Sequence, residues 1–484
     1  MNRSLKILRS STPFLALSGC LLLLFGGGGC ASALSENAPP PLPSEAILQD
    51  SVNSLLGFPR TSKTSEKTGS LDSLEDMESD LQKSLKSGLP TRKTRTLSNL
   101  PTTEIPNLRS FIRVLIKQSS RPIRVRSLGS MQVKSGTKVL GRLRQSFVVN
   151  PEDKLITVYD HNQILSYTSP DSLEFESLND FNVFTLGTRT YRGKLQVFNR
   201  GGSFYYVNNL ALEDYIRGVL PYEIPTQDHA TLEATKAQAI AARTYALRHL
   251  NQYTNQPFDV YDDEKDQVYR GTQGETFLSD LAVKETQNVL LQYQGELAQT
   301  YYHSTCGGHT ASIHDVWKSE PIRYLSARQD KDSLNRAFCA ASPYSNWFES
   351  WALSDLTRMI RTYLPEAGVT QFPNFRRINN IEISEKTPNG RVKTMILDTD
   401  KGPIEVYGDK IRWLFRQTRN QNRILPSSHI TRLSFGPKVS IEGSGHGHGI
   451  GLCQFGALER ARRGQNYIDI LYHYYPGTVL VILQ

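Results

Sequence analysis

The chain has 484 residues, 38% of them hydrophobic, which is ample for a sizeable core and allows two or three domains. Its formal net charge of +9 and pI near 9.1 suit polyanionic partners such as nucleic acid, anionic lipid or anionic wall polymers. No zinc-finger or RNA-binding signature is present, so we expect no nucleic-acid partner.

Residues 1–30 have the pattern of an export signal. Three basic residues precede an apolar core, PFLALSGCLLLLF, and a run of glycines follows it. Two cysteines are candidates for a lipid anchor. Cys20 ends a lipobox-like LSGC after a short core, and Cys30 follows a core of suitable length but lacks the usual leucine. An ordinary signal peptide is the alternative. The segment predicts an exported protein of the cell envelope, held at the membrane by its N-terminal signal or by a lipid.

Residues 31–108 are rich in Pro, Ser, Thr and Lys and show no sustained strand pattern. We expect a disordered linker that acts as a tether, because such a segment buries too little apolar surface to offset the entropy of ordering. From Ser110 the pattern changes to short alternating runs separated by turn residues, which predicts antiparallel strands and hairpins. The runs are FIRVLIK, IRVRSL, KLITVYD, YRGKLQVF and SFYYVNN.

The stretch 211–250 combines an alanine-dense helix with a stiffly held acid. Apolar residues lie on several faces of the helical pattern, which predicts burial, and the alanines allow close approach of neighbouring backbone. Just before this helix, Glu223 stands between Pro221 and Pro225, which restrict the backbone on both sides. We expect a short helix to end near Gly218 or Pro221 and Glu223 to follow in a stiff loop. A preorganised carboxyl suits a general acid, and an ordinary exposed glutamate is the simpler alternative.

Three histidines and a cysteine lie within a dozen residues of one another, a density that suits a metal site. Zn²⁺ accepts nitrogen and sulfur donors in a tetrahedral shell, although the spacing H-x2-C-x2-H-x4-H is not a standard zinc motif. The alternative is a metal-free loop in which Gly307 and Gly308 allow a tight turn. The candidate zinc ligands are His303, Cys306, His309 and His314.

Glycines alternate with other residues along GSGHGHGIGLCQ, residues 443–454, which suits close approach of backbone to a ligand. Its context excludes a phosphate-binding loop, because no GK[ST] ending and no βαβ unit accompany it. Cys306, Cys339 and Cys453 are the cysteines outside the signal. Their odd number argues against a disulfide framework and leaves one bridge open.

Between these stretches, residues 347 to about 433 predict an added α/β lobe with a helix followed by strands around a Pro388-Asn389-Gly390 turn. Strands and helices are interleaved along the chain without regular βαβ spacing. The predicted fold class is therefore α+β, mixed strands and helices built around the buried Ala-rich helix. The added lobe is expected to be structural.

Several blocks resemble one known family. GVLPYEIP followed by EATKAQAIAARTYAL resembles the signature of the stage II sporulation protein D family (SpoIID/LytB), whose members include lytic transglycosylases of the bacterial cell wall. Further family-like blocks are LQVFNRGGSFYYVNNLALEDYIRGVLP, YYHSTCGGHT, DVW and GHGIGLCQFGALERARRGQNYIDILYHYYPGT. The resemblance implies a catalytic domain over residues 109–484, with a signature core at about 203–320 and 443–480.

The resemblance also implies a reaction. Glu223 is expected to act as acid and then base, cleaving the bond between N-acetylmuramic acid and N-acetylglucosamine and leaving a 1,6-anhydro product. The substrate would be peptidoglycan glycan strands already stripped of stem peptides, in sporulation or cell division, with a wall amidase acting upstream. No cofactor is required. The alternative is a non-catalytic glycan-binding module that enhances an N-acetylmuramoyl-L-alanine amidase.

The family further implies which residues surround the acid. Some members carry a zinc near the HSTCGGHT loop, so a structural zinc is an expectation here, although the loop would line the substrate groove without metal as well. The sequence departs from the family pattern at His446, where an aromatic residue is common, and at Cys453, where serine is common. The expected substrate-binding residues are Tyr222, Lys236, Arg243, Tyr302, Ser304, Gly307, Gly308, His448 and Gln454.

Overall fold

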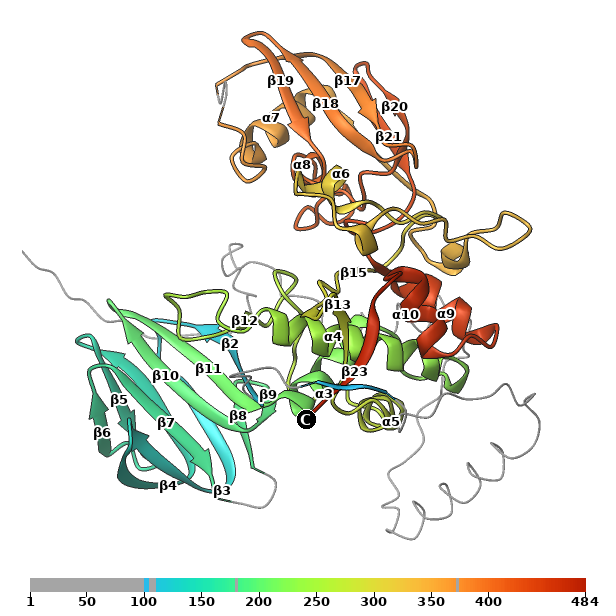
Figure 1. Cartoon of the computed structure of the whole chain (residues 1–484). Coiled ribbons are helices and arrows are strands. Elements are labelled where there is room, and N and C mark those ends of the chain that lie inside the picture. Colours follow the sequence, from blue (N-terminus) through green and yellow to red (C-terminus); the bar gives the residue numbers. More distant parts are fainter. Residues whose placement is uncertain (1–99, 104–109, 179–181, 371–373) are drawn as a thin grey trace, which may run out of the picture. The chain divides into compact units, whose positions relative to one another are not determined.

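The computed structural model describes residues 100–103, 110–178, 182–370 and 374–484 (Figure 1). The expected signal and almost all of the expected linker lie outside these residues. Thr102–Thr103, inside the range expected to be linker, form strand β1, which pairs in parallel with β23 (Val479–Leu483). Within the described ranges, no helix has the length and apolar character needed to cross a bilayer.

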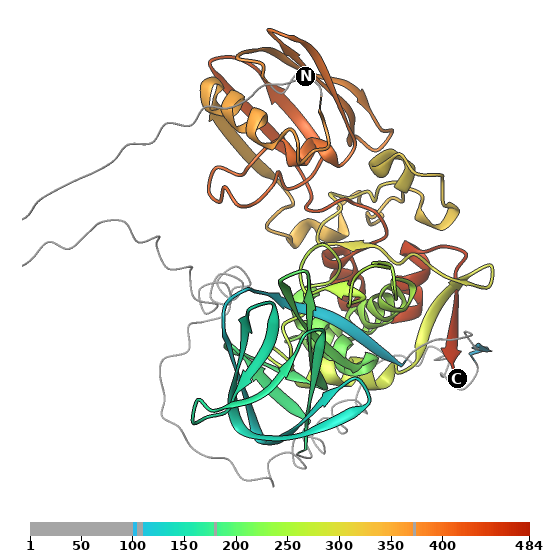
Figure 2. The ribbon, with the colours of Figure 1, turned by 90° about the vertical axis from the view of Figure 1, so that its left-hand side faces the viewer.

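The strands predicted from Ser110 onward are confirmed and form an 11-stranded sheet that curls strongly (Figure 2). In β7, for example, Leu173 and Phe175 point into the core and alternate with partly exposed glutamates, as expected for a strand with one buried face. The strands are β2 (Phe111–Gln118), β3 (Ile123–Ser135), β4 (Lys138–Glu152), β5 (Leu155–Tyr159), β6 (Leu165–Ser169), β7 (Ser172–Ser177), β8 (Val183–Leu186), β9 (Arg189–Arg192), β10 (Lys194–Arg200), β11 (Ser203–Ala211) and β12 (Val260–Tyr261). Their order is β12-β2-β11-β10-β7-β3-β4-β5-β6, and β8 pairs with β3 and β9.

Helix α4 (Leu232–Arg248) is the predicted alanine-rich helix, and it is buried as expected. From Ala234 to Leu247 every residue except Lys236 is buried. The small side chains let four helices pack around it. A short 3₁₀ turn, η2 (His229–Thr231), precedes it, with the Asp228 carboxylate accepting from the Ala230 N–H. The neighbouring helices are α3 (Leu212–Glu223), α5 (Phe277–Glu285), α9 (Gln454–Arg462) and α10 (Tyr467–Tyr474).

The expected end of the helix before Glu223 was wrong. Helix α3 runs through Pro221 and includes Glu223 as its last residue. Proline has no backbone N–H, so Pro221 removes one hydrogen bond from the helix. The Ile224 N–H nevertheless donates to the Leu220 carbonyl at 3.0 Å and closes the final turn. Glycine is required at 218 because a Cβ there would lie 2.5 Å from the Tyr269 ring. The acid is therefore carried by a packed helix instead of a loop.

The rest of the core joins distant parts of the chain. Strand β13 (Val289–Tyr293) pairs with β14 (Glu296–Leu297) and with β23. Strands β15 (Tyr302–His303) and β22 (Leu452–Cys453) pair in parallel, which brings the histidine-rich loop beside the glycine-rich stretch. Short helical segments connect these parts: α6 (Ile313–Trp317), η3 (Arg323–Leu325) and η4 (Phe338–Ala341).

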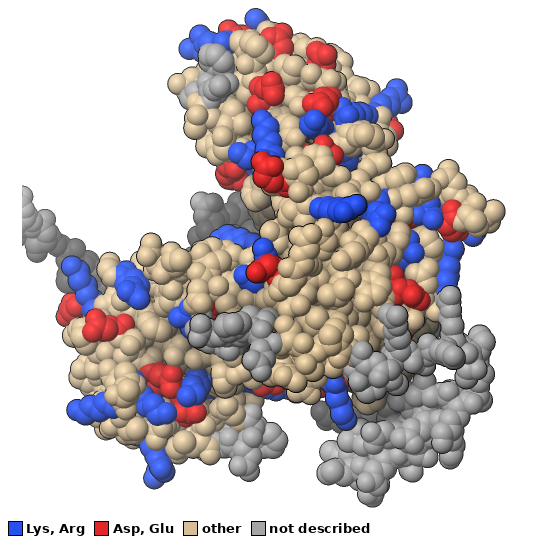
Figure 3. Space-filling model, viewed as in Figure 1, with Lys and Arg blue, Asp and Glu red and all other residues tan. Residues whose placement is uncertain are grey.

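The added lobe, orange in Figure 1, has a hydrophobic core of its own. It extends past the expected end at 433, because β21 pairs with β16 and carries the lobe to residue 443. Its elements are β16 (Trp347–Ala352), α7 (Leu353–Tyr363), β17 (Ile378–Lys386), β18 (Val392–Thr399), β19 (Gly402–Tyr407), α8 (Lys410–Trp413), β20 (Ile430–Ser434) and β21 (Lys438–Gly443). On the face drawn in Figure 3, basic and acidic side chains are interspersed over this lobe and over the strand-rich part.

Candidate active site

Glu223 lies at the C-terminal end of α3 with its side chain partly buried. The Val268 N–H donates to Oε1 at 2.8 Å, and the Gln454 side-chain amide donates to Oε2 at 3.4 Å. Burial raises the pKa of Glu223 to about 7, against the opposing effect of hydrogen bonds from Val268, Gln454 and Tyr302. A carboxyl with this pKa exists in both protonation states near neutral pH, as a group that gives and later takes a proton needs.

Tyr302, on β15, is positioned by a chain of side-chain hydrogen bonds. Its hydroxyl oxygen accepts from Gln267 Nε2 at 2.9 Å, and Gln267 Oε1 accepts from the Tyr215 hydroxyl at 3.2 Å. Burial and the neighbouring Glu223 hold the pKa of Tyr302 well above its usual value. Tyr302 therefore stays protonated, and because its oxygen already accepts from Gln267, its own proton is left for the carboxylate of Glu223.

No functional residue was predicted in the segment that carries Gln267 and Val268. In the structure, Asp266 anchors it by accepting from the Tyr261 N–H at 2.8 Å and from the Tyr253 hydroxyl at 3.1 Å. The donor to Glu223 is a backbone N–H, which leaves no residue-type signal. Sequence reasoning consequently missed both contributions from this segment.

The hydrogen bonds of His448 go to backbone groups of Tyr302 and Ile450. Its Nδ1 accepts from the Ile450 N–H at 3.0 Å, so its Nε2 carries the proton and donates to the Tyr302 carbonyl at 3.0 Å. Burial lowers the pKa of His448 to about 4, so the ring is neutral near pH 7. It holds the backbone of Tyr302, and its role in this geometry is positioning, whereas the sequence led us to expect contact with substrate.

Three other residues expected to bind substrate, Ser304, Gly307 and Gly308, lie close to other residues of the protein. A Cβ on Gly307 would lie 2.7 Å from Ser444 Oγ, and one on Gly308 would lie 2.8 Å from Lys331 Cε. The Ser304 hydroxyl is 3.1 Å from Thr305 Oγ1. The parallel pairing of β15 with β22 turns this loop against neighbouring segments, and these residues make no hydrogen bond to Glu223 in the part of the chain that the structure describes.

Arg243 and Lys236 of α4 were also expected to bind substrate, and in the structure both form ion pairs with acidic side chains of the protein. Arg243 is completely buried and donates to both carboxylate oxygens of Glu213, at 2.8 and 2.7 Å. Lys236 forms ion pairs with Glu233 at 2.7 Å and Glu285 at 2.6 Å. Lys236 and Arg243 are seven residues apart, about two helical turns, so they lie on the same side of α4, where acidic side chains pair with both. Tyr222, next to Glu223 in the chain, is 41% exposed, and its hydroxyl donates to the Gln273 carbonyl at 2.7 Å.

The expected zinc ligands do not converge, so they do not fit a zinc site. His303 is buried with Nδ1 donating to the Ile450 carbonyl at 3.1 Å, and the side chain of His314 is 45% exposed beside Asp315. Among the described residues, the metal-ligand group that contains Cys306 includes none of the histidines. Of the four, His303 lies in β15 and His314 in α6, while Cys306 and His309 lie in the loop between these elements.

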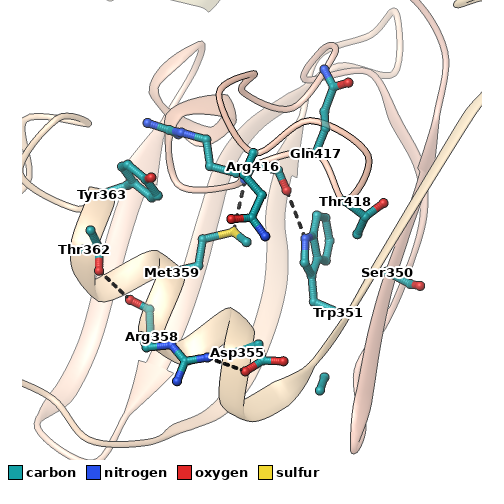
Figure 4. Close-up of a pocket in the computed structure, with 12 residues that line it drawn as sticks. Ser350, Trp351, Asp355, Arg358, Met359, Thr362, Tyr363, Arg416, Gln417 and Thr418 are labelled. Carbon is teal, nitrogen blue, oxygen red and sulfur yellow. Dashed lines mark hydrogen bonds and ion pairs between the residues drawn. The ribbon is translucent and has the colours of Figure 1, made fainter. Parts of the chain in front are cut away.

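The added lobe contains a separate cavity of about 520 Å³ (Figure 4). Trp351 donates from its indole nitrogen to the Arg416 carbonyl at 3.0 Å, and the Arg416 guanidinium lies 3.5 Å from the centre of the Tyr363 ring. Glu223 and its hydrogen-bond partners are not among the residues that line this cavity. The lobe cavity and the candidate active site are distinct.

Comparison with known proteins gives two domain matches. Residues 200–293 match the family model described as Stage II sporulation protein, a range that includes α3, Glu223 and Val268. Residues 340–451 match a Domain of unknown function (DUF8618), a range that covers the added lobe.

Relatives in curated collections agree with the first match. The chain is 31% identical over 299 residues to an uncharacterized protein of Brachyspira hyodysenteriae, covering 62% of this chain and 74% of that one. It is 29% identical to the amidase enhancer of Bacillus subtilis, covering 55% of this chain and 40% of the relative. It is 28% identical to stage II sporulation protein D of Bacillus amyloliquefaciens, and the match covers 57% of this chain and 76% of the relative. The chain therefore belongs to the SpoIID/LytB family.

Proposed function

We propose that the protein is a peptidoglycan lytic transglycosylase of the cell envelope, with Glu223 as its catalytic residue. The observation that carries the proposal is the carboxyl of Glu223, whose pKa burial raises to about 7 while Val268, Gln454 and Tyr302 fix its orientation. Family membership supports a role at the cell wall. The export signal expected in residues 1–30 supports a place outside the cytoplasm.

One carboxyl is enough for this reaction. Protonated Glu223 gives its proton to the glycosidic oxygen as the bond to C1 of N-acetylmuramic acid breaks. The resulting carboxylate then takes the proton from the sugar's own 6-hydroxyl, whose oxygen bonds to C1 and closes a 1,6-anhydro ring. Hydrolytic glycosidases generally need a second carboxylate for water or for a covalent intermediate. The acid is restored at the end of each cycle, and no water is consumed.

A second candidate function is supported by one relative, which is named an amidase enhancer. In that case the protein binds glycan strands without cleaving them and stimulates a separate wall amidase. The site around Glu223 would then be a glycan-binding site.

The test is the product formed from peptide-free glycan strands. We expect the full chain to yield ends one water lighter than hydrolysed ends, identified as 1,6-anhydro sugars by mass spectrometry. Hydrolysed ends would contradict the proposed mechanism. Intact strands, together with stimulation of an added amidase, would support the enhancer instead.

A second expected outcome is the pH dependence of the rate. The reaction starts from protonated Glu223, so kcat/KM on peptide-free strands should fall as the pH rises through about 7. The measurement is a series of initial rates at constant ionic strength from pH 5 to 9. A rate that climbs through pH 7 would assign the first step to a base and oppose the proposal.

A further inference from the structure

Three cysteines and one carboxylate from distant parts of the chain meet in the interior. Cys306, Asp330, Cys339 and Cys453 are all buried, and their ligand atoms lie within 4.8 Å of one another. The sulfurs of Cys306 and Cys339 are 3.6 Å apart. In a tetrahedral zinc shell with Zn–S bonds of about 2.3 Å, two sulfurs lie roughly 3.8 Å apart. The observed separation matches that spacing and exceeds the roughly 2.05 Å of a disulfide.

We propose that these four residues, the thiolate cluster, bind a structural Zn²⁺ ion. Backbone donors already point at the sulfurs. The Cys306 N–H lies 3.2 Å from the Cys453 sulfur, and the Gly456 N–H lies 3.4 Å from the same sulfur. The Gly308 N–H lies 3.3 Å from the Cys306 sulfur. Donors of this kind stabilise a thiolate, the form that binds metal, more than a neutral thiol.

The carboxylate of Asp330 accepts hydrogen bonds from neighbouring side chains, as a carboxylate that binds a metal usually does. Arg460 Nη2 donates to its Oδ1 at 2.8 Å, and the Tyr474 hydroxyl donates to Oδ2 at 3.0 Å. Partners of this kind fix the orientation of a ligating carboxylate. Oδ2 also accepts from the Cys306 thiol at 3.3 Å. When Cys306 gives up its proton to bind zinc, this contact is lost and Oδ2 is free to serve as the fourth ligand.

The surrounding charges supply a second, independent reason for a negative centre. Three thiolates, one carboxylate and Zn²⁺ leave two excess negative charges, and Arg460 offsets one of them. Arg391 is only 2% exposed, and its Nη2 donates to the Cys306 carbonyl at 3.1 Å. Its Nε and Nη1 have no hydrogen-bond partner among the described residues. A guanidinium buried in this way is costly unless negative charge lies nearby, and the thiolate cluster supplies such charge together with Asp409.

The cluster differs from the zinc site expected from the sequence, with which it shares only Cys306. It also reaches the candidate active site through the chain, because Cys453 is the N-cap of α9 and Gln454 follows directly. An ion bound to Cys453 would fix the start of α9 and thereby the amide that contacts Glu223.

The test uses the full chain purified without chelator from medium that contains zinc. Elemental analysis should give about one zinc per chain. Replacement by Co²⁺ should produce thiolate-to-cobalt charge-transfer absorption and the visible bands of a tetrahedral ion. Cys339→Ser and Cys453→Ser should each lose the metal. His309→Ala and His314→Ala are the matched controls from the sequence-predicted set and should retain it.

Three outcomes overturn the proposal. The first is metal-free protein in which the thiols of Cys306, Cys339 and Cys453 all react once the chain is unfolded. The second is a disulfide between two of these three cysteines, identified as a linked pair of peptides that is two hydrogens lighter. The third is zinc that survives both serine substitutions but is lost with the histidines. If the serine variants do not fold, the cobalt spectrum of the unaltered protein decides, because charge-transfer absorption requires thiolate ligands.

Discussion

Replacing Glu223 by Gln is expected to lower kcat on peptide-free glycan strands by roughly 10²- to 10⁴-fold, the usual contribution of a general acid–base residue. Glutamine keeps the size of the side chain and can still accept the Val268 N–H, but it has no proton to transfer. Binding of glycan should be nearly unchanged, so the loss should fall on kcat and leave KM in place. The measurement is steady-state kinetics with mass-spectrometric detection of the anhydro ends.

Glu264→Gln is the matched control. Glu264 is exposed, and its negative charge is among the causes that raise the pKa of Glu223. The same chemical change there should leave most of the activity. A comparable loss from both substitutions would indicate that two carboxylates share the chemistry, as in a hydrolase. Full activity of Glu223→Gln would rule out Glu223 as the acid.

Glu223→Gln should also change how the free energy of unfolding depends on pH. The pKa of Glu223 is about 7 in the folded protein, above its ordinary value of 4.5, so folding favours the protonated form. The contribution of Glu223 to the stability of the unaltered protein therefore falls as the pH rises through this interval, and Glu223→Gln lacks this loss. At pH 8 the variant should unfold with a free energy higher by on the order of 2 kcal/mol, while at pH 4.5 the two should be alike. Reduced activity in a more stable protein would show that the loss is not caused by unfolding.

Arg243→Met is expected to lower the free energy of unfolding by about 3–5 kcal/mol, the cost of removing one partner from a buried ion pair. Arg243 is fully buried, donates to both oxygens of Glu213 and reaches the Val289 carbonyl at 3.3 Å. The substitution leaves the carboxylate of Glu213, 24% exposed, without its cation. Urea unfolding followed by circular dichroism measures the effect.

Lys236→Met supplies the comparison on the same helix. Its partners Glu233 and Glu285 are 32% and 44% exposed, so we expect a change of about 1 kcal/mol or less. Adding Glu213→Gln to Arg243→Met should restore part of the lost stability, because no unpaired charge is then left behind. If Arg243→Met were as stable as the unaltered protein but bound glycan poorly, the substrate-binding role expected from the sequence would be correct.

The sequence predicted those parts of the structure that depend on local periodicity. The alternating runs after Ser110 became strands, and the many-sided apolar pattern of α4 became a buried helix. The end of α3 was wrong because proline near the last turn costs only one hydrogen bond, which the packing of the rest of the helix tolerates. Local patterns predict which element forms more reliably than where it ends.

Site residues were predictable only where the side chain itself carries the chemistry. Glu223, Tyr302 and Gln454 were expected, and the structure brings them together. The Val268 N–H could not be found from residue type, because every residue except proline offers the same donor. The thiolate cluster could not be predicted from the sequence either, because Cys306 and Cys453 meet only through the long-range pairing of β15 with β22.

The position of Glu223 as the last residue of α3 has an electrostatic consequence. Peptide dipoles align along a helix, so its C-terminal end carries partial negative charge and its N-terminal end partial positive charge. The acids Glu213 and Asp214 complement the positive end, whereas no basic residue lies in the last turn. A carboxylate at that end is repelled by the carbonyls of its own helix and binds a proton more tightly. The backbone of α3 thus opposes the ionisation of Glu223 before any sugar arrives, independently of the side chains that surround it.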